Sequence, residues 1–272
     1  MLPNNKAYGL YSCPVSILKL SSHIISQPLA QIFNVSVSSG SFPAKLKTAK
    51  VVPVFKSGDE SKPGNYRPIS LFNYQFSTEY LKSWFIKDLL IIYSSQYGFR
   101  SRHSTQHATL EILNDILSNF DKGQFTFCLF IDLKKAFDTV NYDILLSKLK
   151  NYGFRGVVND WFKSYLIGRR QYTTINGYIS DSPRTLCGVP QGSVLGTLLF
   201  LLYINDLYKS SNKLQFYLFA DDTSLTYANG DLKKLETEIN EELFKVCSSL
   251  VVNKLTLNIK KTNYRYIIFH PP

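Results

Sequence analysis

The chain places acidic residues at the ends of apolar runs of strand length. Residues 125–133 (FTFCLFIDL) form a continuous apolar run, as expected for a strand buried on both faces, and a carboxylate, Asp132, stands at its end. Two more β-prone runs, 214–220 and 224–227, are joined by a short turn that contains Asp221-Asp222. The pattern therefore predicts carboxylates at the tips of separate strands.

Apolar residues at helical spacing predict several helices. They are expected over residues 143–152, 157–166, 193–207 and 232–250, and the last is a long amphipathic helix. Gly153 is placed as the C-terminal cap of the first of these. The first 40 residues are expected to form a helix-rich lead-in that ends near Gly40.

The remaining segments predict strands and turns. Residues 49–55 are β-prone and lead into a Gly-, Lys- and Pro-rich loop over 56–68. Residues 171–179 alternate and contain Asn176-Gly177, the strongest short signal for a tight hairpin. With a final strand over 264–269, the order of elements predicts an α+β fold, a layer of helices on a largely antiparallel sheet.

Composition excludes a disordered chain and indicates an anionic partner. The 272 residues are 44% hydrophobic and 14% aromatic, enough to build one or two domains with a sizeable core. Lys and Arg number 31 against 20 Asp and Glu, which gives a formal net charge of +11. Charge alone leaves nucleic acid, an acidic membrane surface and an acidic protein partner all open.

The absence of a secretory signal pattern and the spacing of the cysteines favour an intracellular location. They do not distinguish the nucleus from the cytoplasm. The N-terminus lacks a secretory signal pattern, and the longest apolar run, 198–204, is far short of a membrane span. No cysteine pair has metal-ligand spacing, so buried thiols in a reducing compartment are expected. The cysteines are Cys13, Cys128, Cys187 and Cys247.

The acidic strand tips suggest metal chemistry. If their strands are neighbours, Asp132 and Asp221-Asp222 converge on one edge of the sheet, where three carboxylates would repel one another unless they bind a divalent cation. Two such ions can activate an attacking hydroxyl and stabilise a leaving oxygen in phosphoryl transfer. Taken alone, however, an Asp-Asp pair in a turn is usually an ordinary solvated turn.

Five blocks in the correct order resemble a known family, and together they cover nearly the whole chain. Residues 130–149 (FIDLKKAFDTVNYDILLSKL), 189–207 (VPQGSVLGTLLFLLYINDL) and 219–225 (FADDTSL) resemble the A, B and C blocks of the reverse transcriptases of non-LTR (LINE- or jockey-like) retrotransposons. Upstream, GSFPAKLKTAKVVPVFKSGD with NYRPISL resembles their first fingers block, and QYGFRSRHSTQHA the second.

The resemblance implies an RNA-directed DNA polymerase with right-hand architecture. Residues 1–40 would be a helical lead-in, 41–120 the fingers and 121–272 the palm, and the primer-grip hairpin and thumb are expected to be absent. The implied partners are an RNA template, a DNA primer and deoxynucleoside triphosphates. The implied cofactor is a pair of Mg²⁺ (or Mn²⁺) ions.

The resemblance assigns roles to residues of the A and C blocks, position by position. Asp132 and Asp221 match catalytic metal ligands, with Asp222 beside them, so all three are expected at the metal site. Phe137, five residues after Asp132, matches the residue that lies under the sugar and excludes a 2′-hydroxyl.

The other blocks supply candidate nucleotide contacts. Gln191 and Gly192 match the loop that lies against the incoming nucleotide and template base, where glycine allows close backbone approach. Lys50 and Arg67 match the block that faces the triphosphate, although an exposed strand-edge lysine explains Lys50 equally well. Lys261, in a segment that resembles the D block, is a candidate to protonate pyrophosphate or an ordinary surface lysine.

Three functions stay open from the sequence. The intact acidic residues favour an active polymerase module. The shortened segment between Leu71 and Gln96, where a finger helix is expected to be damaged, and the missing thumb favour a catalytically inactive remnant that still binds RNA. The sequences of the motifs SVLGTLLF and NYRPISL disfavour a related polymerase such as a group II intron maturase or telomerase.

Overall fold

The structure, a computed structural model, describes residues 17, 20–71, 91–175 and 177–268. The chain forms two compact units that interleave along the sequence. Unit 1 contains Met1–Asp88 and Tyr142–Leu199, and unit 2 contains Leu89–Asn141 and Phe200–Pro272. The predicted fingers and palm boundaries stay a prediction, and most of the segment in which a damaged finger helix is expected lies outside the described residues.

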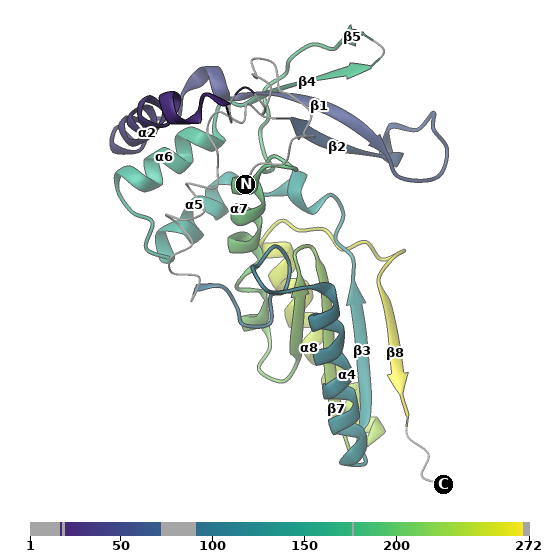
Figure 1. Ribbon diagram of the computed structural model, residues 1–272. Coiled ribbons are helices and arrows are strands. Elements are labelled where there is room, and N and C mark those ends of the chain that lie inside the picture. Colours follow the sequence, from purple (N-terminus) through teal and green to yellow (C-terminus); the bar gives the residue numbers. More distant parts are fainter. Residues whose placement is uncertain (1–16, 18–19, 72–90, 176, 269–272) are drawn as a thin grey trace. The chain divides into compact units, whose positions relative to one another are not determined.

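Unit 1 is built on a four-stranded sheet in the order β2-β1-β4-β5 (Figure 1). Its strands are β1 (Thr48–Phe55), β2 (Tyr66–Leu71), β4 (Arg170–Ile175) and β5 (Tyr178–Ile179). β4 and β5 form the predicted hairpin, with Gly177 at φ +84° in its turn. The sequence pattern did not predict that β1 pairs with β4 in parallel, which joins this hairpin to β1 and β2.

Helices of unit 1 pack around a buried tryptophan. They are α2 (Ser22–Ser38), α5 (Tyr142–Asn151) and α6 (Val157–Leu166), all near their predicted positions, and Gly153 follows α5 at φ +96°. Trp161 of α6 is fully buried, packs edge-on against Phe42 at 5.5 Å, and donates from its indole nitrogen to Ser36 Oγ of α2 at 2.9 Å. This contact fixes α2 against α6.

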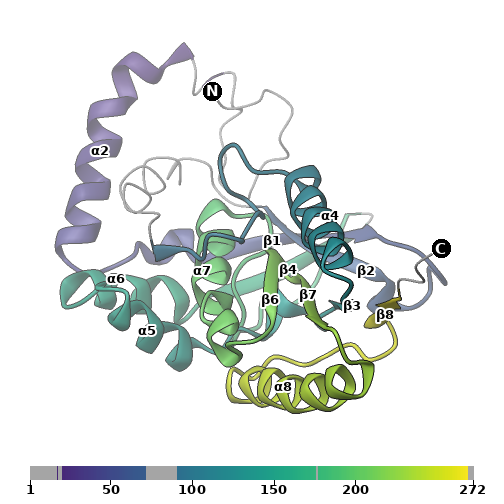
Figure 2. The same cartoon turned by 90° about the horizontal axis from the view of Figure 1, so that it is seen from below.

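Unit 2 is an antiparallel sheet in the order β6-β7-β3-β8, covered on both faces. Figures 1 and 2 show α4 on one face and α8 on the other. The double cover explains why residues 126–129 of β3 are all buried, as predicted. The elements are α4 (Thr105–Asp121), β3 (Phe125–Ile131), β6 (Gln215–Phe219), β7 (Asp222–Asn229), α8 (Leu232–Val252) and β8 (Asn263–Ile267).

The remaining elements are one helix and several short turns. α7 (Val194–Ile204) is the predicted apolar helix, and nearly all of its described side chains are buried. The 3₁₀ turns are η1 (Ala44–Leu46), η2 (Pro63–Asn65), η4 (Ala136–Thr139) and η5 (Leu207–Ser210). No helix among the described residues is long and apolar enough to cross a membrane.

The thiol prediction is right for one cysteine and wrong for two. Cys128 lies inside β3, and burial raises its pKa to about 11. Cys187 and Cys247 are exposed. Cys187 lies in a surface loop, and Cys247 lies on the outer side of α8. Cys13 lies outside the described residues.

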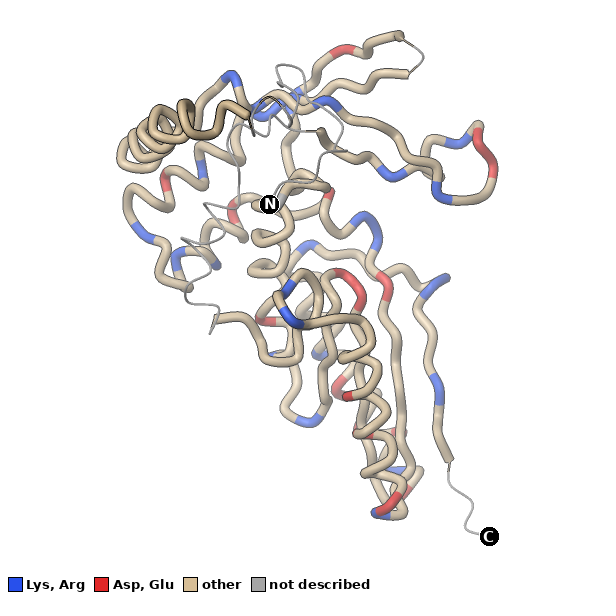
Figure 3. The backbone as a smooth tube through the Cα atoms, in the orientation of Figure 1, with Lys and Arg blue, Asp and Glu red and all other residues tan. Residues whose placement is uncertain are grey.

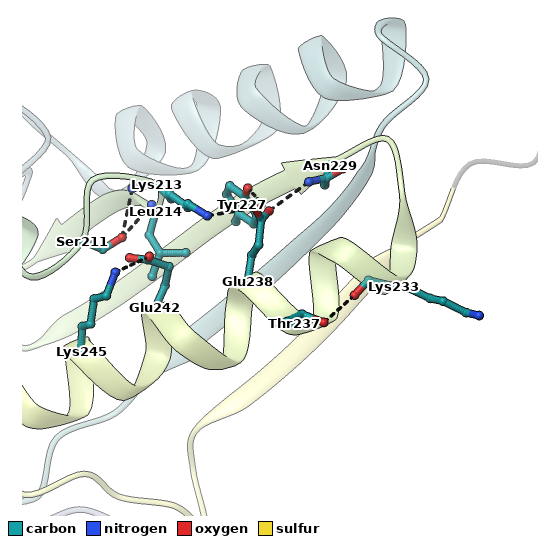
Figure 4. Close-up of polar contacts among 10 residues, drawn as sticks. All are labelled: Ser211, Lys213, Leu214, Tyr227, Asn229, Lys233, Thr237, Glu238, Glu242 and Lys245. Atoms are coloured by element: carbon teal, nitrogen blue, oxygen red, sulfur yellow. Dashed lines mark hydrogen bonds and ion pairs between the residues drawn. The ribbon is translucent and has the colours of Figure 1, made fainter.

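A polar network attaches α8 to the sheet of unit 2 (Figure 4). Glu238 Oε2 accepts hydrogen bonds from Tyr227 Oη at 2.5 Å and Asn229 Nδ2 at 3.0 Å, and its Oε1 pairs with Lys213 Nζ at 2.9 Å. One turn along, the buried Glu242 pairs with Lys245 at 2.6 Å. The hydrogen bond from Tyr227, followed by that from Lys213, lowers the pKa of Glu238 from 4.5 to about 2.

This network predicts an acid-dependent loss of stability. Because the folded-state pKa of Glu238 is depressed, its contribution is present above pH 4.5 and is lost as the pH falls toward about 2. Glu238→Gln should therefore flatten the fall in unfolding free energy between those pH values, measured by urea denaturation at stepped pH. Glu241→Gln, at an exposed position of the same helix, is the control. Equal pH slopes in parent and Glu238→Gln would contradict the assignment.

Candidate functional site

The β6–β7 hairpin carries two of the predicted carboxylates, one in its two-residue turn and one at the start of β7. Phe219 pairs with Asp222, so only Ala220 and Asp221 lie between the strands. Ala220 adopts φ +58°, a left-handed conformation that is uncommon for a residue with a side chain. Asp222 opens β7 and is not in the turn, which corrects its predicted place by one position.

Asp132 follows β3 at the same end of the sheet. The β3–β7 ladder ends with Ile131 paired to Thr223, so extending its register by one residue brings Asp132 opposite Asp222. Asn258 holds Asp132 twice: its backbone nitrogen donates to the Asp132 carbonyl at 2.8 Å, and its Nδ2 donates to Oδ2 at 2.6 Å. The condition for the expected convergence, that the acidic strands are neighbours, is therefore met.

The donor set at this end of the sheet consists of carboxylates. Among the residues that the structure describes, no group of three or more His, Cys, Asp or Glu could by itself hold a metal ion. Carboxylate oxygens are nevertheless the hard donors that Mg²⁺ and Mn²⁺ accept, and Mg²⁺ commonly takes only one or two of them together with substrate phosphates. The chemistry of the donors therefore fits a divalent cation completed by a phosphate ligand.

Two further predicted residues belong to unit 2. Phe137 lies in η4, is 9% exposed, and stacks on Phe200 with ring centroids 4.3 Å apart, so it is at least part of the core. Lys261 is exposed in the turn that precedes β8, and its backbone nitrogen donates to the Asn258 carbonyl at 3.0 Å. The catalytic roles expected of the two residues stay predictions.

Unit 1 carries two other candidates, Lys50 and Arg67, on one face of its sheet. Lys50 of β1 pairs with Leu71 of β2, and Arg67 of β2 pairs with Val54 of β1. On each strand, the two paired positions are four residues apart. Because alternate residues and cross-strand partners share a face, Lys50 and Arg67 project from the same side. Lys50 is half-buried on a central strand, so describing it as a strand-edge lysine is wrong.

The Gln191-Gly192 loop is anchored to the free edge of β2. Ser70 donates from its backbone nitrogen to the Gln191 carbonyl at 3.0 Å. Gly192 has φ +95°, and a Cβ there would lie 3.2 Å from the Ser70 carbonyl oxygen and 3.4 Å from a methyl of Ile69. Ile69 alternates with Arg67 along β2, so the loop lies beside the face that carries both cations.

The candidates therefore divide between the two units. Unit 2 holds Asp132, Asp221, Asp222, Phe137 and Lys261, and unit 1 holds Lys50, Arg67, Gln191 and Gly192. The sequence pattern missed a role for Asn258, although this residue opens the segment that resembles the D block. An asparagine in a polar loop carries no signal of its own, and only the spatial approach to Asp132 reveals it.

Comparison with known proteins connects these features to a family. A family model described as reverse transcriptase (RNA-dependent DNA polymerase) matches residues 54–267. The chain is 32% identical over 275 residues to a probable RNA-directed DNA polymerase from transposon BS of Drosophila melanogaster, a match that covers 96% of this chain and 30% of the relative. It is 30% identical over 214 residues to the RNA-directed DNA polymerase from mobile element jockey of the same organism, covering 76% and 23% respectively.

These matches confirm the resemblance to non-LTR retrotransposon enzymes, while the chain spans less than a third of the length of either relative. Among solved structures, telomerase from Candida albicans in complex with a TWJ fragment of telomeric RNA matches with a TM-score of 0.52 and 14% identity, over 89% of this chain and 46% of that one. At that identity the likeness shows the fold alone. It confirms the predicted α+β class of fingers and palm.

The approach of Gly192 to β2 predicts a large penalty for a side chain there. Gly192→Ala should destabilise the protein by about 1–3 kcal/mol, because alanine rarely adopts this φ and its Cβ meets main chain. Gly64→Ala is the matched control, since no atom lies within 4 Å of a Cβ at that position. The two variants should differ clearly in urea unfolding, and equal midpoints would show that the loop is not anchored as described.

Proposed function

Because this chain belongs to the reverse transcriptase (RNA-dependent DNA polymerase) family, we propose that it is the part of an RNA-directed DNA polymerase that performs nucleotidyl transfer. The observation that carries the proposal is the placement of Asp132, Asp221 and Asp222 at one end of adjacent strands. Phosphoryl transfer requires positioning and charge stabilisation more than covalent chemistry, and carboxylates fixed on a rigid sheet suit both needs.

Asp132 and Asp221 act as the carboxylates that hold the divalent cations, with Asp222 adjacent. When bound, a pair of such ions activates the primer 3′-hydroxyl and stabilises the departing oxygen. Asn258 orients Asp132 through its donation to Oδ2, which leaves the other carboxylate oxygen for the cation. Phe137 excludes a 2′-hydroxyl on the incoming sugar, supported from behind by its stacking on Phe200.

The face of unit 1 that carries Lys50 and Arg67 serves the triphosphate. Guanidinium and ammonium groups form charge-assisted hydrogen bonds to phosphate oxygens, and no acidic partner of either residue is seen in the described parts of the chain. Gln191 and Gly192 lie against the nucleotide, in a loop that the missing side chain of Gly192 allows to lie close to β2. Lys261 protonates the departing pyrophosphate, and its exposure also fits the alternative of an ordinary surface lysine.

The partners proposed are an RNA template, a DNA primer and deoxynucleoside triphosphates. Lys and Arg are spread over both units and do not form a single tract, as Figure 3 shows. Together with the net charge of +11, this distribution favours contacts with the phosphate backbone over reading of one base sequence. Tolerance of sequence is what template copying requires.

The metal-site assignment predicts a separation of catalysis from binding. Asp132→Asn and Asp221→Asn should each abolish primer extension with Mg²⁺ or Mn²⁺, because a neutral amide replaces an anionic ligand, while RNA affinity changes by less than about threefold since the basic surface is intact. Asp121→Asn, at the exposed end of α4, is the control. Full extension by either site variant refutes the metal site. RNA binding without extension by the parent favours an inactive remnant.

The position of Phe137 predicts a change in sugar selection. Phe137→Val should admit ribonucleotides, lowering the preference for deoxyribonucleotides by on the order of 10-fold or more, because the ring that contacts the 2′ position is removed. Stability should also fall, since the stacking on Phe200 is lost. Phe216→Val removes another buried ring, from β6, and controls for that effect. A preference equal to that of the parent would make Phe137 a core residue only.

A further inference from the structure

A short segment upstream of α4 covers the open edge of β6. Tyr97 donates from its backbone nitrogen to the Leu218 carbonyl at 2.7 Å, and the Leu218 nitrogen donates to the Ser95 carbonyl at 2.8 Å. These bonds form a single parallel bridge centred on Gln96 and Leu218. Since β6 is the outermost strand of its sheet, the segment protects that edge as far as the turn that carries Asp221.

The side chain of Gln96 continues this cover onto the turn. Gln96 is 1% exposed, and its Oε1 accepts hydrogen bonds from the backbone nitrogens of Ala220 at 3.0 Å and Gly98 at 2.9 Å. Both partners are donors, so the atom between them is the amide oxygen. Ala220 is itself buried, and its nitrogen lies where the ladder with β7 has ended, so Gln96 supplies the acceptor that a buried N–H needs.

Two neighbours of Gln96 hold this arrangement in place. A Cβ on Gly98 would lie 2.4 Å from the Ala220 nitrogen and 2.9 Å from the Phe219 carbonyl carbon, so only glycine permits the approach. Arg100 Nη1 donates to the carbonyls of Tyr93 at 3.2 Å, and of Ser94 and Gln96 at 3.0 Å each. Arg100 thus holds the segment together through its hydrogen bonds, and Gly98 allows the segment to pack against the turn.

We propose that Gln96 is a positioning residue for Asp221, acting through its hydrogen bond to the Ala220 backbone. Ala220 has an uncommon positive φ, and such a conformation persists only where its surroundings determine it. Because Asp221 is the next residue, fixing the Ala220 nitrogen fixes the direction in which the Asp221 carboxylate leaves the turn. The inference rests on the proposed function for its catalytic meaning, although the hydrogen bond can be tested without activity.

Amide hydrogen exchange of the whole chain, followed residue by residue by NMR, tests the contact directly. Gln96→Met keeps the size of the side chain but removes the acceptor, and should accelerate exchange at Ala220 by about tenfold or more, the factor that corresponds to one lost hydrogen bond. Gln96→Glu keeps an acceptor oxygen and should stay within about threefold of the parent. Gln215→Met, the same change at an exposed position of β6, is the control.

Parent-like exchange at Ala220 in Gln96→Met would overturn the proposal. So would an equal acceleration at the amides of β3, which would indicate general loosening. If Gln96→Met does not fold, Arg100→Met provides the second test, because Arg100 is partly exposed and its loss releases the segment that carries Gln96. Faster exchange at Gly98 and Ala220 would then support the contact, and unchanged rates would contradict it.

Primer extension gives the catalytic readout. Gln96→Met should lower kcat by about 10- to 100-fold, as expected for a displacement of the order of 1 Å at the reacting groups, with the KM for template-primer unchanged. Gln96→Glu should recover most of that loss. Faster Ala220 exchange with an unchanged kcat would refute the positioning role. Absence of extension by the parent would refute the proposed function and leave the exchange result to decide the contact.

Discussion

The candidate site depends above all on the register between β3 and β7. Seven consecutive pairs, from Phe125↔Asn229 to Ile131↔Thr223, determine which residue stands opposite Asp132. A slip of one residue would turn every side chain of β3 to the other face and carry the aspartate with it. Both faces of the sheet are covered, by α4 and α8, so such a slip would place each side chain of β3 in packing space shaped for a residue of different size. The hydrophobic core therefore sets the position of the acidic residues.

The two units position their candidate site residues in different ways. Unit 2 presents carboxylate side chains from strand ends, and Asn258 restrains Asp132 through a side-chain hydrogen bond. Unit 1 presents a loop by its main chain, because Ser70 binds the Gln191 carbonyl and Gly192 allows contact with β2. Under the proposed function, the carboxylate keeps a fixed direction toward a cation, whereas the loop is held close to β2 and offers its main chain to the nucleotide. The choice of residue follows from these different requirements.

Most local elements could be predicted from the sequence, and most pairings between distant segments could not. The apolar run of β3 and the Asn176-Gly177 hairpin signal are local patterns, and both elements form as predicted. The parallel pairing of β1 with β4 joins segments more than 100 residues apart, and neither strand carries a mark of its partner. For that reason the sequence left a strand-edge position open for Lys50, whereas β4 covers the side of β1 that faces away from β2.

The turn that carries Asp221 shows why a contact that positions a functional residue can leave no signal in the sequence. A glycine at Ala220 would adopt the positive φ without strain, but it would also widen the range of conformations open to the next residue. An alanine restricts that range and then needs an external contact to hold it in an unfavourable region. Gln96 supplies the contact from 124 residues away in the sequence, at the start of the segment that resembles the second fingers block. Rigidity at the carboxylate is thus obtained from a distant segment whose sequence does not indicate its contact with the turn.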